Sequence, residues 1–470
     1  MTQKLLSDIK KAANILKELK ESQINILTHY DADGLSAAGS LVNWFRNQNT
    51  KFLCRVSYDL SEEDITSFLK TKCDAYIFLD LGSGQLDFIK KAKPKDTLAI
   101  VLDHHQMKMD PTEIDNLIMV NPEVHGIDGG KEACGSALSA LTTYYASDKI
   151  ETNCLKMGIV GSVGDMQGEG GPDSINQVLF QEAEKSGIMK SRKEFSFFRL
   201  REYPVHKAIS YSMIPYIPGL SGKEDQAVTL LTSAGFKLKE NGKFKKVKDL
   251  NDQEKSEIID KILEYTISVG GNVDSSEFIS KIYEFPFETC SFLMEATEFA
   301  ITLNTCGKMG KQDLGILLAS SNRDQDLIDE IINLKQEKRS IVSSQLNLLS
   351  GIMKKEGKIL ILDGRGKIDT KLLGTFSTYY SQSPVYSGNI ILVFGEEEKG
   401  KIKVSSRAPK EFVDKGLNLG NILNESAKKL GGVGGGHRIA AGATLIGGDE
   451  AIRTVVELCL DEVNKIENQI

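Results

Sequence analysis

The feature that most constrains the fold is a series of short apolar runs, each followed by a stretch with helical periodicity, between residue 24 and about residue 180. The runs include INIL, AYIF and LAIV, and the helical pattern GLSAAGSLVNWFRNQ follows the first of them. Runs rich in Ile, Leu and Val that alternate with helices are typical of parallel strands covered on both faces. This part of the chain is therefore predicted to be an α/β domain built on a parallel sheet.

The remaining sequence predicts further domains, for which 470 residues are enough. A mostly helical, charged pattern extends from about residue 181 to 320. Residues 322–356 contain no proline and a single glycine, Gly351, and their apolar residues lie at helical spacing. The strand-like runs KILILDG, NIILVFG and KIKVSSR then precede a glycine-dense turn, GGVGGGH. We predict four parts: a parallel-sheet domain at 1–195, a mainly helical middle region at 196–321, a connecting helix at 322–357 and a smaller α/β domain at 358–470.

Composition narrows the class of protein. Hydrophobic residues make up 40% and charged residues 26%, and no stretch approaches the ~18 uninterrupted apolar residues of a membrane span, so we expect a soluble, cytoplasmic protein that does not act at a membrane. The seven cysteines form no C-x-x-C pair, which argues against a disulfide framework and a thiolate zinc site. The net charge of -7 gives no global attraction to nucleic acid, so a polyanion would have to be held by local basic groups or bound metal.

Acids and histidines follow the apolar runs at four places. They are His29, Asp31 and Asp33 after INIL; Asp80 after AYIF; Asp103, His104 and His105 after LAIV; and Asp165 in GIVGSVGDMQ. Taken singly, an aspartate after a strand is often a helix cap and a lone histidine is often a packed or surface residue. Together they predict one cluster, because the carboxyl ends of parallel strands meet at the same crevice.

Carboxylates mixed with imidazoles and without cysteine suit manganese or magnesium. Two such ions about 3.5–4 Å apart can share a bridging carboxylate, lower the pKa of a bound water and stabilise both oxygens of an in-line phosphoryl displacement. The cluster therefore predicts phosphoester hydrolysis with two divalent metal ions, Mn²⁺ or Mg²⁺.

The order H-x-D-x-D-G, D-L-G, D-H-H and G-x-x-x-D resembles the DHH phosphoesterase superfamily, and GGVGGGHRIAAGA resembles the GGH motif of the DHH-associated domain. Three stretches resemble the RecJ branch: NPEVHGIDGGKEACGSA, IPGLSGKEDQAVTLLTSAG and EFAITLNTCGKMGKQDLGILLAS. The resemblance covers nearly the whole chain and is strongest to the archaeal RecJ-like group. It implies a DHH domain at 1–195 and a DHH-associated, substrate-binding domain at 358–470.

The resemblance also implies roles for the clustered residues. Asp80 would bridge two metal ions, His29 and Asp31 would complete one site, and Asp33, His104 and Asp165 would complete the other. Asp103 would orient its neighbour, since ligating imidazoles need their other nitrogen hydrogen-bonded, and His105 would face the scissile phosphate. Bacterial RecJ enzymes typically carry an aspartate where this chain has His29.

Six further residues are candidates for binding the nucleic-acid backbone. Asn304 and Lys308 lie in LNTCGKMG, where the family commonly has arginine at the lysine position, and a purely structural turn is the alternative. Arg407, Gly435, Gly436 and His437 would form a phosphate clamp, because glycine lets backbone N–H groups approach a phosphate closely. A glycine-rich turn that serves only packing is the alternative there.

These patterns predict a metal-dependent exonuclease that acts on single-stranded DNA or RNA in replication or repair. One alternative is an oligoribonuclease or cyclic-dinucleotide phosphodiesterase. The other follows from the resemblance of archaeal RecJ-like proteins to a replicative-helicase cofactor: a scaffold with little activity that binds the GINS replication complex. The sequence does not decide the polarity of degradation or the preference for DNA or RNA.

Overall fold

The computed structural model describes residues 1–470 except 59–60, 150, 272–273 and 468–470. The chain divides into two compact units, each made of two segments. Unit 1 comprises Met1–Lys193 and Lys281–Gln336, and unit 2 comprises Glu194–Ser280 and Glu337–Ile470.

Unit 1 is built on a five-stranded parallel sheet with the order β2-β1-β3-β4-β5. The strands are β1 (Gln23–His29), β2 (Lys51–Ser57), β3 (Ala75–Leu79), β4 (Leu98–Leu102) and β5 (Leu117–Val120). The strand order reverses between β1 and β3, and such a switch point is where open α/β sheets bind ligands. The predicted parallel-sheet fold is confirmed.

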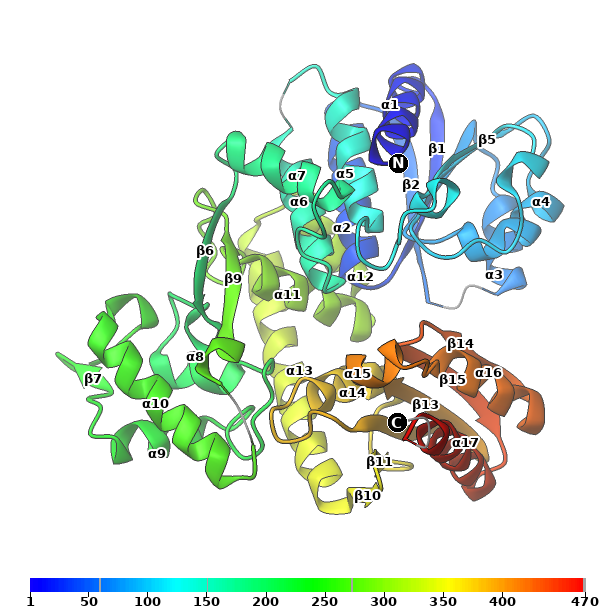
Figure 1. Ribbon diagram of the computed structural model, residues 1–470. Helices are drawn as coiled ribbons and strands as arrows, with labels where there is room; N and C mark the ends of the chain where they lie inside the picture. The colour runs from blue at the N-terminus through cyan, green and yellow to red at the C-terminus, as the bar shows by residue number, and fades with distance from the viewer. Residues whose placement is uncertain (59–60, 150, 272–273, 468–470) are drawn as a thin grey trace. The chain divides into compact units, whose positions relative to one another are not determined.

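Helices cover both faces of this sheet (Figure 1). Alternate residues of a strand point to opposite faces, so Ile77 and Leu79 of β3 join one core cluster while Tyr76 and Phe78 join the other. The first cluster contains residues of α1 (Thr2–Glu18), α2 (Ala32–Asn47), α5 (Gly135–Ala146), α6 (Thr152–Gly164) and α7 (Ile175–Lys185). The second contains residues of α3 (Glu62–Leu69) and α4 (Leu86–Ala92).

Residues 281–336 return to unit 1 after the first segment of unit 2. The strands β6 (Lys190–Phe195) and β9 (Ile279–Glu284) pair where the chain leaves and re-enters the unit. Phe299 and Leu303 of α11 (Ala296–Lys308) and Leu318 of α12 (Gln312–Ala319) are buried in the first core cluster. The end of the predicted middle region therefore packs within unit 1.

The predicted long helix is present as α13 (Gln325–Ile352), which runs from the last segment of unit 1 into unit 2. It is shorter than the pattern predicted because residues 354–356 form strand β10. The other part of unit 2 contains α8 (Val205–Tyr211), α9 (Glu224–Ser233), α10 (Asp252–Ser268) and the short strands β7 (Lys239–Glu240) and β8 (Lys243–Phe244).

Unit 2 also contains a six-stranded mixed sheet with the order β10-β11-β12-β13-β15-β14. Its remaining elements are β11 (Ile359–Asp363), α14 (Leu373–Ser381), β12 (Ile390–Glu398), β13 (Lys401–Arg407), α15 (Lys410–Asp414), α16 (Leu419–Leu430), β14 (Gly432–Gly436), β15 (Ala440–Ile446) and α17 (Asp449–Glu467). These elements confirm a second α/β fold.

The sequence predicts a turn at the glycine-dense segment, and this prediction is wrong. The segment forms the edge strand β14. A Cβ on Gly434 would lie 2.4 Å from the carbonyl oxygen of Leu423 in α16. The missing side chain therefore lets the helix approach the strand, and the strand pairs with β15 on its other side.

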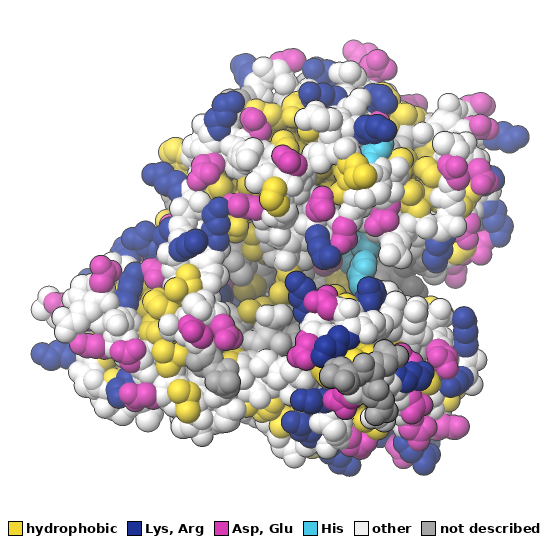
Figure 2. Space-filling view, in the orientation of Figure 1, with side chains coloured by type: hydrophobic (Ala, Val, Ile, Leu, Met, Phe, Trp, Pro, Cys, Tyr) yellow, Lys and Arg dark blue, Asp and Glu magenta, His cyan; other side chains and the backbone are white. Residues whose placement is uncertain are grey.

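Basic and acidic side chains are interspersed over the face shown in Figure 2, in keeping with the small net charge. In the described part of the chain, no helix combines the length and apolar character needed to cross a membrane.

Candidate metal centre

The first ligands lie where β1 gives way to α2. His29 is the last residue of the strand, Asp31 caps the helix by accepting a hydrogen bond from the Gly34 amide at 3.0 Å, and Asp33 lies in the first helical turn. A Cβ on Gly34 would lie 2.4 Å from the His29 carbonyl oxygen. The spacing H-x-D-x-D-G therefore arises from a strand, a tight turn and a helix start.

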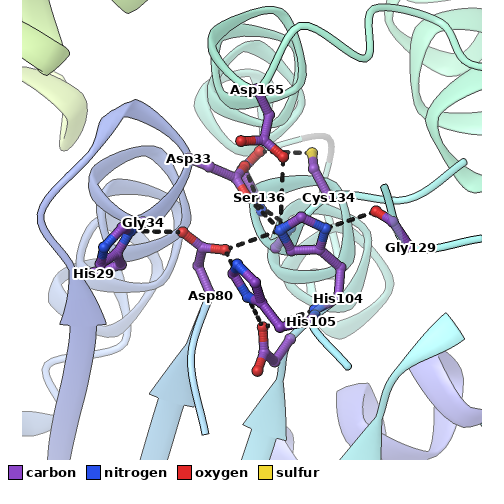
Figure 3. A network of polar contacts seen from close by, with 12 residues as sticks. His29, Asp33, Gly34, Asp80, His104, His105, Gly129, Cys134, Ser136 and Asp165 are labelled. Atoms are coloured by element: carbon purple, nitrogen blue, oxygen red, sulfur yellow. Dashed lines mark hydrogen bonds and ion pairs between the residues drawn. The ribbon is translucent and has the colours of Figure 1, made fainter. Parts of the chain in front are cut away.

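Asp80 lies at the centre of the cluster, directly after β3 (Figure 3). Its backbone is in the left-handed region, with φ of 56°, an uncommon conformation that concentrates at functional sites. The side chain is buried, with Oδ1 3.3 Å from Nε2 of His104 and Oδ2 3.5 Å from Nδ1 of His29. Neither carboxylate oxygen accepts a hydrogen bond from any residue that the structure describes.

Burial, together with the nearby carboxylates of Asp33 and Asp31, raises the pKa of Asp80 to about 7. A buried carboxylate without hydrogen-bond donors is costly in free energy, and a divalent cation would supply the missing positive charge. The residues present therefore fit a metal ion at this position.

His104 is held by its Nδ1 nitrogen, which lies 2.6 Å from the carbonyl oxygen of Gly129. A carbonyl oxygen only accepts, so Nδ1 carries the proton and Nε2 is directed at the carboxylates of Asp80, Asp33 and Asp165. A hydrogen bond of this kind fixes the orientation of ligating histidines. A Cβ on Gly129 would lie 2.0 Å from the His104 carbonyl oxygen, so this approach requires glycine.

Asp33 is fixed by the start of α5. Its Oδ2 accepts from the Gly135 amide at 2.7 Å and its Oδ1 from the Ser136 amide at 3.0 Å. The two amides belong to the first turn of α5, so the helix start holds the Asp33 side chain in place.

Asp103 is fully buried and its acceptor sites are occupied. Its Oδ1 accepts from the His104 amide at 2.8 Å and lies 2.7 Å from Nδ1 of His105, while Oδ2 accepts from the Ser83 amide at 2.8 Å. Burial lowers the pKa of His105, but the Asp103 carboxylate outweighs that effect and raises it to about 9. The side chain of His105 is half-exposed, and its Nδ1 is held by the buried Asp103 carboxylate.

Asp165 is the C-cap residue directly after α6, and its Oδ2 lies 3.6 Å from Nε2 of His104. Gln167, which sequence reasoning missed, donates from Nε2 both to Asp165 Oδ2 and to the Gly129 carbonyl oxygen, each at 3.0 Å. Gln167 therefore links the Asp165 carboxylate to the Gly129 carbonyl group, which holds His104. Its only sequence signal is its place two residues after Asp165.

The structure thus brings together all the acids and histidines predicted from the four motifs. The run before Asp165 is not a strand, in contrast to the prediction, because GIVGSVG forms the end of helix α6. Three groups place one ligand atom per residue within 4.8 Å of one another: His29, Asp31 and Asp80; Asp33, His104 and Asp165; and Asp80, His104 and His105. The number of ions and the role of each residue stay predictions.

Asn304 and Lys308 lie on α11 in the same unit. The Asn304 Oδ1 accepts from the Ala32 amide at 3.0 Å, and a Cβ on Gly307 would lie 1.8 Å from the Tyr30 carbonyl oxygen. This helix therefore supports the loop between β1 and α2. Contact of Asn304 or Lys308 with a substrate stays a prediction.

The four candidates of unit 2 gather at one end of its larger sheet. Arg407 ends β13 opposite Ala440, and the His437 amide donates to the Ala440 carbonyl oxygen at 2.8 Å. Gly435 and Gly436 belong to the neighbouring β14. Burial lowers the pKa of the Arg407 guanidinium. Binding of phosphates by this group stays a prediction.

Three family models match the chain: the DHH family N-terminal domain at residues 23–161, the DHH-CID domain at 198–279 and the DHHA1 domain at 357–465. An uncharacterized protein of Methanocaldococcus jannaschii is 27% identical over 462 residues, which cover 94% of this chain and 95% of that protein.

Solved structures with a similar fold include RecJ of Thermus thermophilus in complex with Mn²⁺, with a TM-score of 0.59 and 15% identity over 96% of this chain. This chain spans about half of that protein, 55% of its length. An exonuclease RecJ bound to manganese has a TM-score of 0.57 and 16% identity, covering 97% of this chain and 94% of its own. CDC45 of Entamoeba histolytica has a TM-score of 0.62 and 12% identity, covering 97% and 98%. At these identities the likeness shows the fold.

Proposed function

The chain belongs to the DHH superfamily, and from that membership we propose that it is a cytoplasmic, metal-dependent exonuclease that hydrolyses single-stranded DNA or RNA in replication or repair. The observation that carries the proposal is Asp80, a buried carboxylate that accepts no hydrogen bond from the described part of the chain and is surrounded by groups that could ligate a metal ion. The fold shared with an exonuclease RecJ bound to manganese supports it. The division into four parts stays a proposal, and the three family models fall on three of those parts, at 23–161, 198–279 and 357–465.

Two Mn²⁺ or Mg²⁺ ions would be held by six side chains: His29, Asp31, Asp33, Asp80, His104 and Asp165. Oxygen and imidazole donors without thiolates suit these metals. When bound, the ions supply an activated water and neutralise charge on the phosphate.

The chain's own groups prepare the reaction around that centre. Asp103 forms a hydrogen bond with Nδ1 of His105, so the other ring nitrogen, Nε2, points away from Asp103. With a pKa of about 9, His105 is protonated at neutral pH and can donate a hydrogen bond from Nε2 to the scissile phosphate. Arg407 and the glycines of β14 would hold backbone phosphates farther along the strand.

A second function is favoured by the likeness to CDC45, whose fold covers nearly all of this chain. A scaffold that binds a replication complex such as GINS needs no hydrolysis. The ligand positions of this chain are all filled with competent residues, so we propose an active enzyme and treat a partner as an addition to it.

Digestion of end-labelled single-stranded DNA and RNA oligonucleotides, with Mn²⁺, Mg²⁺ or EDTA, tests the proposal. We expect stepwise shortening from one end with either metal and none in EDTA. Intact oligonucleotides under all metal conditions, with a folded protein, would favour the scaffold.

A further inference from the structure

A surface depression of about 460 Å³ lies at the carboxyl end of β2, within unit 1. The residues that line it include Arg55, Ser57, Tyr58, Ser61, Glu63 and Asp64. Ser57 is the register partner of His29, so the depression lies one strand away from a candidate metal ligand, a spacing of about 4.8 Å. We refer to it as the β2 pocket.

An aromatic series connects the β2 pocket to the metal centre. The Tyr58 ring stacks on Tyr30 with centroids 4.7 Å apart and planes at 21°, and Tyr30 contacts the His29 ring at 4.6 Å. The Tyr58 hydroxyl donates to the Gly307 carbonyl oxygen at 2.6 Å, which fixes the ring. Tyr58 is nevertheless 41% exposed, so part of its surface is available to a ligand.

The charges of the β2 pocket do not suit a phosphate. The Arg55 guanidinium is paired with Asp64, whose other carboxylate oxygen accepts from the Ser57 hydroxyl. The N-terminus of α3 is already capped by the Ser61 hydroxyl, which accepts from the Asp64 amide. Glu63 adds a carboxylate that has no ion pair or hydrogen bond among the described residues, so the lining carries an excess negative charge.

We infer that the β2 pocket binds the terminal nucleoside of the substrate strand. Its base stacks on Tyr58 and its sugar hydroxyls donate to Glu63 and the neighbouring serine hydroxyls. The pocket therefore selects a strand end that carries a hydroxyl over one that carries a phosphate, because a terminal phosphate would meet the unpaired carboxylate. This inference rests on the proposed nuclease function.

Dinucleotides with a single scissile phosphate test the selection. Hydrolysis of ApA, pApA and ApAp is compared with Mn²⁺ present. We expect a phosphate at one of the two ends to lower kcat/KM by about tenfold or more, and the sensitive end identifies the one that enters the β2 pocket. Equal rates on all three compounds, or a preference for a phosphorylated end, would overturn the inference.

Variants assign the effect to the pocket. Glu63→Gln is expected to reduce the discrimination to about threefold or less, while Glu62→Gln, which removes a carboxylate of the same helical turn that pairs with Lys91 outside the pocket, leaves it unchanged. Tyr58→Ala, which removes the ring on which the terminal base stacks, should lower kcat/KM on ApA by about tenfold. Identical behaviour of the two glutamate variants would contradict the assignment.

Titration calorimetry with ApA, pApA and ApAp in EDTA measures binding to the pocket without turnover. ApA is expected to bind more tightly than the dinucleotide that carries a phosphate at the sensitive end, and equal or weaker binding of ApA would count against the inference. Because binding is measured separately, a chain that binds with this preference but hydrolyses none of the dinucleotides or oligonucleotides would contradict only the nuclease proposal.

Discussion

At the scale of single residues, Asp80 combines three features that oppose stability: a buried carboxylate, a positive φ and the lack of a hydrogen-bond donor among the residues described. Its pKa is about 7 in the metal-free folded protein, against the usual 3.8. A carboxyl whose folded pKa is raised favours folding fully below the unfolded pKa, and this contribution is lost as pH rises through about 7.

Asp80→Asn should therefore abolish hydrolysis while leaving the metal-free protein as stable as the unmodified chain, or more stable, at pH 8. Asparagine tolerates the left-handed backbone and carries no charge to desolvate. Thermal unfolding in EDTA and oligonucleotide digestion measure the two effects. A large loss of stability would mean that Asp80 supports the fold rather than the metal.

His105→Ala is predicted to lower kcat about 10²-fold or more while retaining bound metal, since its proposed partner is the phosphate. Metal analysis of the purified variant beside digestion rates checks this. Loss of bound metal together with activity would make His105 a ligand.

At the scale of elements, two adjacent glycines of β14 are expected to differ in role: Gly434 in packing and Gly435 in binding phosphate. A Cβ on Gly434 meets the Leu423 carbonyl oxygen at 2.4 Å, whereas one on Gly435 has no atom within 4 Å. We predict that Gly434→Ala lowers the free energy of unfolding by about 1–3 kcal/mol. Gly435→Ala should leave the free energy of unfolding unchanged but lower kcat/KM on oligonucleotides. Chemical denaturation and kinetics distinguish them, and equal stability losses would leave β14 with a packing role alone.

The sequence predicts the elements that carry the candidate ligands because strand, turn and helix signals are local. His29, Asp80 and His104 each follow an apolar run, and parallel strands bring such ends together. What holds the ligands comes from distant segments: the α5 amides on Asp33, Gly129 on His104 and Asn304 on Ala32. Nothing in local periodicity indicates these contacts. The sequence also predicts a turn at β14, because its run of glycines carries no signal of the packing of Gly434 against α16.

At the scale of the whole molecule, metal binding should be linked to stability and pH. The candidate ligands must lose protons to bind a cation, and Asp80 and Asp165 have pKa values raised to about 7 and about 6, chiefly by burial. Mn²⁺ affinity is therefore predicted to increase from pH 5.5 to 8. At a fixed Mn²⁺ concentration of 100 times the Kd at pH 8, the ion should stabilise the fold by about 2.7 kcal/mol at that pH and by less at pH 5.5, where Kd is larger. Unfolding with and without Mn²⁺ across this range measures it, and a pH-independent shift would contradict the site.

On long substrates, residues of unit 2 are expected to bind backbone phosphates while the candidate metal centre of unit 1 hydrolyses the strand. Arg407→Ala with His437→Ala should lower kcat/KM about tenfold on a long oligonucleotide and less on a dinucleotide, because phosphates held far from the cut bond matter only when present. The comparison of substrate lengths separates a polymer nuclease from a small-molecule phosphodiesterase. A greater loss on the dinucleotide would favour the latter.

The division of each unit into two segments has a consequence for synthesis on the ribosome. The hydrogen bond from the Ala32 amide to Asn304 joins residues 272 positions apart, with the first segment of unit 2 between them. At about 5–20 residues per second, roughly 14–54 s pass between the emergence of the two partners. Throughout that interval the residues of the candidate metal centre lack α11, so unit 1 is completed only after the first segment of unit 2 has been made.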